Sequence, residues 1–232
     1  MSNISKTYNG RVIDIIYTSP DTYKLKLEIE NKQRIPFFAG QYAVLAMDSF
    51  EGSPFSIASA PHEEFLEFHV KDTGRGMSNH IATNLKLGHA INITAPLGKS
   101  YLKEPNSPIL AIAGGLGITQ MKSIIEASLY NKVKHPIHLY WGVRGIENLY
   151  LDNHFINLAK NNPNFSYVPV LSEETEVTKH KTGFVTEAIL TDFPDVKDMD
   201  IYLAGPNIMV QSLLPILIQK EADKDRIFSD SL

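Results

Sequence analysis

The sequence predicts an antiparallel β-barrel followed by an open α/β domain. Two observations carry this prediction. Up to about residue 100, short segments alternate apolar and polar residues with a period of two, as half-buried strands do. After about residue 105, uninterrupted apolar strands alternate with helical segments, which is typical of a parallel sheet covered on both faces. We place the boundary in the connector between them, so that the barrel domain spans residues 1–103 and the α/β domain residues 104–232.

Six segments of the first part are predicted strands. The two clearest each have one apolar face, made of Tyr23, Leu25, Leu27 and Ile29 in YKLKLEIE and of Leu66, Phe68 and Val70 in FLEFHVK. The other candidates are GRVIDIIYT, QYAVLAM, PFSIAS and AINITA, with Gly, Pro and Asp residues between them. One helix, in MSNHIATNLKLG, interrupts the strands. Six short strands in about ninety residues are typical of a small antiparallel barrel.

The second part contains four apolar strands, each followed by a helix. The strands are ILAIAGG, IHLYWGV, FSYVPVLS and DIYLAGP, and the helices are expected to begin near Ile118, Asp152, Gly183 and Asn207. Ligands of open α/β sheets bind beyond the carboxyl ends of the strands. The segments AIAGGLG and YLAGP both end there, so this edge is the expected binding edge.

Composition excludes several classes of function. The chain has 232 residues and a net charge of -4, which gives no general reason to expect nucleic acid or an anionic membrane as a partner. It has no cysteine, so it carries no disulfide, thiolate zinc site or iron–sulfur cluster of its own. Its eight histidines are dispersed, and no metal site is expected. The N-terminus lacks the features of a signal peptide and no apolar run spans a bilayer, so we expect a cytoplasmic protein.

Two glycine turns are the candidate ligand sites. Gly114, Gly115 and Gly117 allow a sharp turn after a buried strand, and the helix that follows directs its positive end at the same point. This turn alone fits a plain strand–helix connection as well as a phosphate site, because Gln120 breaks the G-x-G-x-x-G pattern. Gly205 and Pro206 end a second buried strand in the same way. Two such turns on one edge of the sheet favour an extended dinucleotide.

The order of the motifs carries a resemblance to a known family. The succession PFSIASAP, GRGMS, APLG, AGGLGIT, YWGVR and YLAGP resembles the ferredoxin–NAD(P)H reductase superfamily, and is most similar to its NAD(P)H:flavin oxidoreductases, the flavin reductases. The resemblance extends from about residue 8 to about residue 230. It implies a barrel that binds flavin, as FAD or FMN, and an α/β domain that binds NADH or NADPH.

The resemblance also implies a role for particular residues. It places Ser56 near the flavin N5 atom as the catalytic residue. It places the flavin against Pro54, Phe55, Ser56, Ile57, Ala58, Ser59, Val70, Lys71, Gly76, Met77 and Ser78. It places the nicotinamide coenzyme against Gly114, Gly115, Gly117, Ile118, Thr119, Arg144, Gly205 and Pro206. The chemistry is then a hydride transfer between two stacked rings, which requires no acid–base pair or metal.

The chain departs from the family at three positions. Ser53 stands where the family usually has an arginine that anchors the flavin side chain or its phosphate, a contact for which Lys71 or Arg75 would have to substitute. Gln120 replaces a proline, and Ala204 replaces a frequent cysteine. The acidic segment SEET at 172–175 favours NADH over NADPH.

Three functions remain open at this point. The first is an oxidoreductase that passes a hydride from NAD(P)H to a flavin that binds and leaves as a substrate, as the loss of arginine at Ser53 indicates. The second is a flavoprotein reductase subunit that holds FAD and passes electrons to a separate iron–sulfur or oxygenase protein, as the intact GRGMS segment indicates. The third is a nucleotide-binding module without catalysis.

Overall fold

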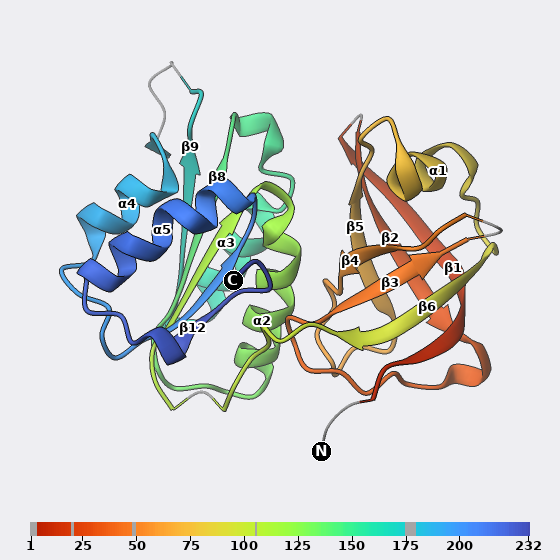
Figure 1. The fold of residues 1–232 in the computed structure, drawn as a ribbon, viewed down its shortest axis with the longest axis horizontal. Helices are drawn as coiled ribbons and strands as arrows, with labels where there is room; N and C mark the ends of the chain where they lie inside the picture. The colour runs from red at the N-terminus through yellow and green to blue at the C-terminus, as the bar shows by residue number, and fades with distance from the viewer. Residues whose placement is uncertain (1–3, 20, 48–49, 105, 175–179) are drawn as a thin grey trace. The chain divides into compact units, whose positions relative to one another are not determined.

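The computed structural model describes residues 4–19, 21–47, 50–104, 106–174 and 180–232 (Figure 1). The chain forms two compact units. The first comprises residues 1–102 together with residues 122–127, and the second comprises residues 103–121 and 128–232. Each unit contains its own six-stranded sheet. None of the helices within the described ranges is long and apolar enough to cross a membrane.

The first unit is an antiparallel barrel, as the period of two predicts. Its strands are β1 (Lys6–Ser19), β2 (Thr22–Ile29), β3 (Tyr42–Ala46), β4 (Ser53–Ser56), β5 (Leu66–Lys71) and β6 (Ala90–Leu97). They pair in the order β4-β3-β6-β1-β2-β5. An antiparallel bridge between Ile57 and Phe68, and a hydrogen bond of 2.7 Å from Ala58 N to Glu67 O, join the two end strands. The sheet is therefore nearly closed.

The predicted inward faces form the barrel core. Leu25 and Leu27 of β2 and Phe68 and Val70 of β5 are completely buried. The helix α1 (Gly76–Asn84) adds Met77 and Ile81 to this core, and it begins one residue earlier and ends several residues earlier than the sequence indicates. The barrel prediction and its inward faces are confirmed.

Strand β5 does not follow the simple alternation, because its second face is buried too. Glu67 and His69 are 7% and 3% exposed. The Glu67 carboxylate lies 2.8 Å from His69 Nε2 and 3.3 Å from Lys122 Nζ, and Lys122 also pairs with Glu126 at 2.9 Å. Residues 122–127 belong to the same compact unit as β5. The alternation alone predicts that Glu67 and His69 face solvent, but in the structure they face this ionic cluster instead.

The second unit is the predicted α/β domain with a parallel sheet. Its strands are β7 (Ile109–Gly114), β8 (Ile137–Val143), β9 (Phe165–Leu171), β10 (Lys181–Thr182), β11 (Asp200–Ala204) and β12 (Ile227–Phe228), in the order β10-β9-β8-β7-β11-β12. Its helices are α2 (Ile118–Tyr130), α3 (Asp152–Asn161), α4 (Val185–Asp192) and α5 (Asn207–Gln219). Strands β10 and β12 were not predicted, because each has only two residues and so shows no periodicity in the sequence.

Helices cover both faces of this sheet (Figure 1). On one face, Ile112 of β7 packs in a core cluster with Ile189 of α4 and Leu213 of α5. On the other, Trp141 of β8 contacts the ring of Phe155 in α3, with centroids 6.3 Å apart. Because both faces are buried, only the strand ends are open to a ligand, and the carboxyl ends of all these parallel strands meet at one edge.

Candidate active site

The first glycine turn has open space beside it and one supporting hydrogen bond. Strand β7 runs into a single 3₁₀ turn, Gly115–Gly117, and α2 begins directly after it at Ile118. Gly115 has φ +52°, and no atom lies within 4 Å of the place where a Cβ would stand. The indole Nε1 of the fully buried Trp141 donates to the Gly115 carbonyl at 2.9 Å. The Trp141 hydrogen bond therefore supports the turn through the Gly115 carbonyl, while the space beside the Gly115 Cα is open to a ligand.

The second glycine turn packs directly against the first. A Cβ on Gly117 would stand 2.0 Å from the Ala204 carbonyl oxygen at the end of β11. A Cβ on Gly205 would stand 3.0 Å from Gly114 Cα, and Gly205 has φ +153°. Only glycine allows this approach, because real Cβ atoms do not come within 3.0 Å of backbone. The two turns therefore form one continuous surface at the carboxyl edge.

A pocket of about 520 Å³ opens on this surface, within the size range of small-molecule sites. The residues that line it come from the carboxyl ends of β7, β8, β9, β10 and β11 and from the N-terminal turns of α4 and α5. They are Gly114, Gly115, Gly142, Val143, Arg144, Ser172, Gly183, Phe184, Val185, Thr186, Pro206, Ile208, Met209 and Ser212. Four residues expected to bind the coenzyme, Gly114, Gly115, Arg144 and Pro206, are among them.

The other four expected residues are not among those that line the pocket. Gly117 and Gly205 set the contact between the two turns, and Ile118 is completely buried. Thr119 is 3% exposed, and its hydroxyl has no hydrogen-bond partner among the described residues. A buried polar group without a partner is costly, so this hydroxyl fits a site that a ligand completes. Direct contact of these four residues with the coenzyme stays a prediction.

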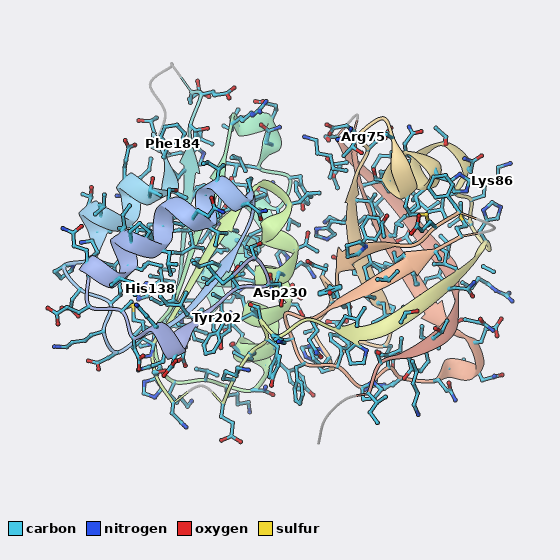
Figure 2. All side chains as sticks on the ribbon, viewed as in Figure 1. Arg75, Lys86, His138, Phe184, Tyr202 and Asp230 are labelled. Carbon is cyan, nitrogen blue, oxygen red and sulfur yellow. The ribbon has the colours of Figure 1, made fainter. Side chains whose placement is uncertain are left out.

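Sequence reasoning missed much of the apolar wall. Phe184, which is labelled in Figure 2, precedes α4 and is 63% exposed. Ile208, in the first turn of α5, is 75% exposed. Exposed apolar side chains of this size at the rim of a pocket are suited to contact a planar ring. The signal for Phe184 was weak because it follows a strand of only two residues. Ile208 looks like any other apolar position of a helix.

On the barrel, the segment PFSIAS lies along the seam that closes the sheet. Ser56 is half-buried at the end of β4, opposite Tyr42 of β3. The next three residues, Ile57, Ala58 and Ser59, are buried, and the Ser59 hydroxyl accepts a hydrogen bond of 3.0 Å from Glu67 N. Phe55 is half-buried and packs against the barrel core. Pro54 is exposed and Ser56 is half-buried, so both are accessible to a ligand.

The start of α1 fits an anion. Arg75 is the N-cap residue, it makes no side-chain capping bond, and it is exposed beside the helix (Figure 2). Gly76 has φ +64° and open space around it. The Ser78 hydroxyl bonds to the Arg75 carbonyl at 3.2 Å, and so it does not occupy the first N–H groups of the helix. Those N–H groups are the ones that a helix leaves without an internal partner, and they attract phosphate.

Lys71 already has an ionic partner. Its Nζ lies 3.1 Å from the carboxylate of Asp21. Burial would raise the pKa of Asp21, but hydrogen bonds from Ser19 and Thr22 and the charge of Lys71 lower it on balance. Val70, the preceding residue, points into the core and is completely buried. Arg75 is therefore a better candidate than Lys71 for the anion contact that the family's arginine, replaced here by Ser53, is expected to make.

Two family models match this chain. A model for an oxidoreductase FAD-binding domain matches residues 9–101, and one for an oxidoreductase NAD-binding domain matches residues 111–214. The two matches correspond to the barrel and to the parallel-sheet domain. The chain belongs to this family of FAD- and NAD-binding oxidoreductases.

Several relatives that resemble the chain over almost its whole length are named for flavin reduction. A probable flavin reductase of Aliivibrio fischeri is 34% identical over 232 residues, covering 96% of this chain and 97% of the relative. An NAD(P)H-flavin reductase of Vibrio harveyi is 34% identical over 226 residues, covering 91% and 92%. The crystal structure of the Amycolatopsis cytochrome P450 reductase GcoB superposes with a TM-score of 0.92 at 26% identity, over 99% of this chain and 71% of that one.

Proposed function

We propose that this member of the family is an NAD(P)H:flavin oxidoreductase. The observation that carries the proposal is the pocket that the two packed glycine turns line, in a chain whose other unit matches an FAD-binding domain. A hydride from the nicotinamide and a proton from water together reduce the flavin by two electrons, and the coenzyme is oxidised by two. The reaction requires the rings to stack with about 3–3.5 Å between the reacting atoms.

The α/β domain binds and orients the coenzyme. The N-termini of α2 and α5 direct their positive ends at the pocket, which suits a pyrophosphate. Gly115 and Pro206 hold the nicotinamide half, and the buried Thr119 hydroxyl supplies a polar contact. Phe184 and Ile208 exclude water at the rim.

The barrel orients the flavin. The half-buried Ser56, at the end of β4, would hold the flavin ring by donating a hydrogen bond from its hydroxyl to N5. The start of α1, with Arg75, Gly76, Met77 and Ser78, takes the phosphate when the flavin is FMN or FAD. Met77, buried in the barrel core, anchors this helix.

The flavin binds and leaves as a substrate. Ser53 cannot make the bidentate charged contact of an arginine, which is among the stronger polar contacts, and Lys71 is engaged with Asp21. The ring is then the main determinant of recognition, and riboflavin, FMN and FAD should all serve. Reduced nicotinamide coenzymes are supplied in the cytoplasm, which is where we place this activity.

A reductase component for a protein acceptor is the second candidate, favoured by particular relatives. A CDP-6-deoxy-L-threo-D-glycero-4-hexulose-3-dehydrase reductase of Yersinia pseudotuberculosis is 33% identical over 230 residues, which are 97% of this chain and 69% of that protein. Because this chain has no cysteine, an iron–sulfur acceptor would have to be a separate protein. The third candidate is a binding module that holds the coenzyme without oxidising it.

Oxidation of NADH by thoroughly desalted protein separates these candidates. We expect a rate that appears only with added riboflavin, FMN or FAD and saturates with the flavin concentration. A yellow protein bleached by NADH without added flavin would favour the reductase component instead. No oxidation of NADH or NADPH with any flavin, despite coenzyme binding, would leave only the binding module.

A further inference from the structure

The segment that closes the barrel contacts both a strand and a helix. This closing segment, residues 57–59, directly follows Ser56, the last residue of β4. It pairs with β5, where Ala58 N donates to Glu67 O at 2.7 Å. It also contacts α2, whose residues 122–127 belong to the same compact unit as the barrel strands.

Two consecutive side chains of α2 hold two consecutive carbonyls of the closing segment. Ser123 Oγ donates to the Ser59 carbonyl oxygen at 2.8 Å. Lys122 Nζ donates to the Ala58 carbonyl oxygen at 3.4 Å. Ser123 and Ser59 are 0% and 1% exposed, so no solvent is available to replace their bond. The helix therefore contributes to the position of the backbone that follows Ser56.

Lys122 is a buried charge in this position. Its side chain is 10% exposed, and its Nζ lies 3.3 Å from Glu67 and 2.9 Å from Glu126. Burial would lower the pKa of Lys122, but the charges of Glu126 and Glu67 raise it on balance, so the amine stays protonated. His69 bonds to Glu67 at 2.8 Å, and the charge of Lys24 acts on the same carboxylate. A charged donor is thus kept at the Ala58 carbonyl.

Stability alone does not require this arrangement. Apolar side chains of similar volume, in place of a buried ion pair, often leave the free energy of unfolding unchanged or raise it. Hydrogen bonds, by contrast, have a preferred length and direction. Two donors directed at neighbouring carbonyls therefore restrict the position of the closing segment more closely than apolar packing would.

We propose that Ser123 and Lys122 are positioning residues for the flavin, an inference that rests on the proposed function. Both act through the closing segment. They fix the backbone after Ser56, whose hydroxyl is proposed to bind flavin N5. Loss of either bond lets this backbone shift, and a misplacement of about 1 Å near the reacting atoms costs about 100-fold in turnover.

Ser123→Ala tests this role, with Ser128→Ala as the matched control. Both variants remove a completely buried hydroxyl from α2, but Ser128 belongs to the other compact unit. Binding is measured from the fluorescence of riboflavin during titration with protein, so that no turnover is needed. We expect riboflavin to bind about tenfold more weakly to Ser123→Ala and less than twofold more weakly to the control. ADP-ribose affinity, measured by calorimetry, should be unchanged in both.

The contribution of Lys122 requires a compensated variant. Lys122→Met alone would leave the carboxylates of Glu67 and Glu126 buried without a cation, and the chain would be destabilised for that reason. Lys122→Met/Glu67→Gln/Glu126→Gln removes the donor and both carboxylate charges together. We expect this variant to unfold at a temperature close to that of the wild type and to bind riboflavin about tenfold more weakly. Lys122→Arg, which keeps a charged donor, should bind riboflavin within threefold of the wild type.

Turnover shows whether Ser123 acts through Ser56. With saturating NADH and riboflavin, we expect Ser123→Ala to lower kcat about tenfold. Ser56→Ala/Ser123→Ala should be no slower than Ser56→Ala alone, because the group that Ser123 positions is already gone.

Three results would overturn the positioning role. They are unchanged riboflavin binding in a folded Ser123→Ala, an equal loss of binding in Ser128→Ala, and additive losses of kcat in the double variant. Failure of the proposed function is distinct, because it would show as absence of NADH oxidation by the wild-type chain with every flavin, while the riboflavin titrations still compare the variants.

Discussion

Gly117→Ala, compared with Gly115→Ala, tests whether contact between the two glycine turns positions the coenzyme. A Cβ on Gly117 would stand 2.0 Å from the Ala204 oxygen and 2.8 Å from Gly205 N, both backbone atoms that no rotamer change can move. At Gly115 the space is open, and only the positive φ of +52° opposes a side chain.

The expected magnitudes differ accordingly. Relief of the clash at Gly117 requires the turns to separate by about 1 Å, and a misplacement of that size costs about 100-fold in turnover. Overpacking of this kind also lowers the free energy of unfolding by about 1–3 kcal/mol. At Gly115 the left-handed backbone costs about 1 kcal/mol with alanine and displaces nothing. We therefore expect kcat/KM for NADH to fall about 100-fold in Gly117→Ala and only a few-fold in Gly115→Ala.

Steady-state NADH oxidation with saturating FMN gives kcat/KM, calorimetry with ADP-ribose gives coenzyme affinity, and thermal unfolding shows that each variant is folded. Flavin affinity should be unchanged in both variants, because both substitutions lie outside the barrel unit. A folded Gly117→Ala with wild-type kcat/KM would refute the reasoning, as would a larger loss in Gly115→Ala.

Three further predictions follow from single contacts. Ser56→Ala should lower kcat about 10- to 100-fold while ADP-ribose affinity stays the same, because it removes only the proposed hydrogen bond to the flavin; stopped-flow measurement of NADH oxidation checks this. Trp141→Phe removes the donor to the Gly115 carbonyl and should lower the free energy of unfolding by about 1–3 kcal/mol and raise KM for NADH; denaturant unfolding and kinetics measure the two effects, and an unchanged KM would mean that the turn needs no support. For Glu67, burial would raise the pKa, but the hydrogen bond from His69 and the charge of Lys122 lower it from 4.5 to about 2. A carboxyl group with a lowered pKa in the folded state stabilises the fold above pH 4.5, and this contribution is lost as the pH falls to about 2. Glu67→Gln should therefore flatten the acid limb of a stability–pH curve over that range, and an equally steep limb would contradict the assignment.

Local patterns determined the fold class and predicted the sheet edge at which the pocket opens. Alternating residues such as Leu25 and Leu27 can only bury one face of a strand, so the barrel followed from the period of two. Uninterrupted strands such as β7 required cover on both faces, which left the carboxyl edge for ligands. Gly115 and Pro206 were predictable for the same reason, because each follows such a strand.

Contacts between distant parts of the chain decided what the patterns could not. Glu67 and His69 occupy positions that alternate with the core residues. Their burial depends on the contact between them and on Lys122, which is more than fifty residues away in the sequence. Arg144 and Glu173 became a pair because the pairing of β8 with β9 sets their strand ends side by side. Periodicity reports which face of an element is apolar, whereas strand order and the packing of helices determine which side chains share a pocket. The sequence by itself therefore determined the fold of each unit and the sheet edge at which the pocket opens, and the tertiary structure decided which charged side chains meet there.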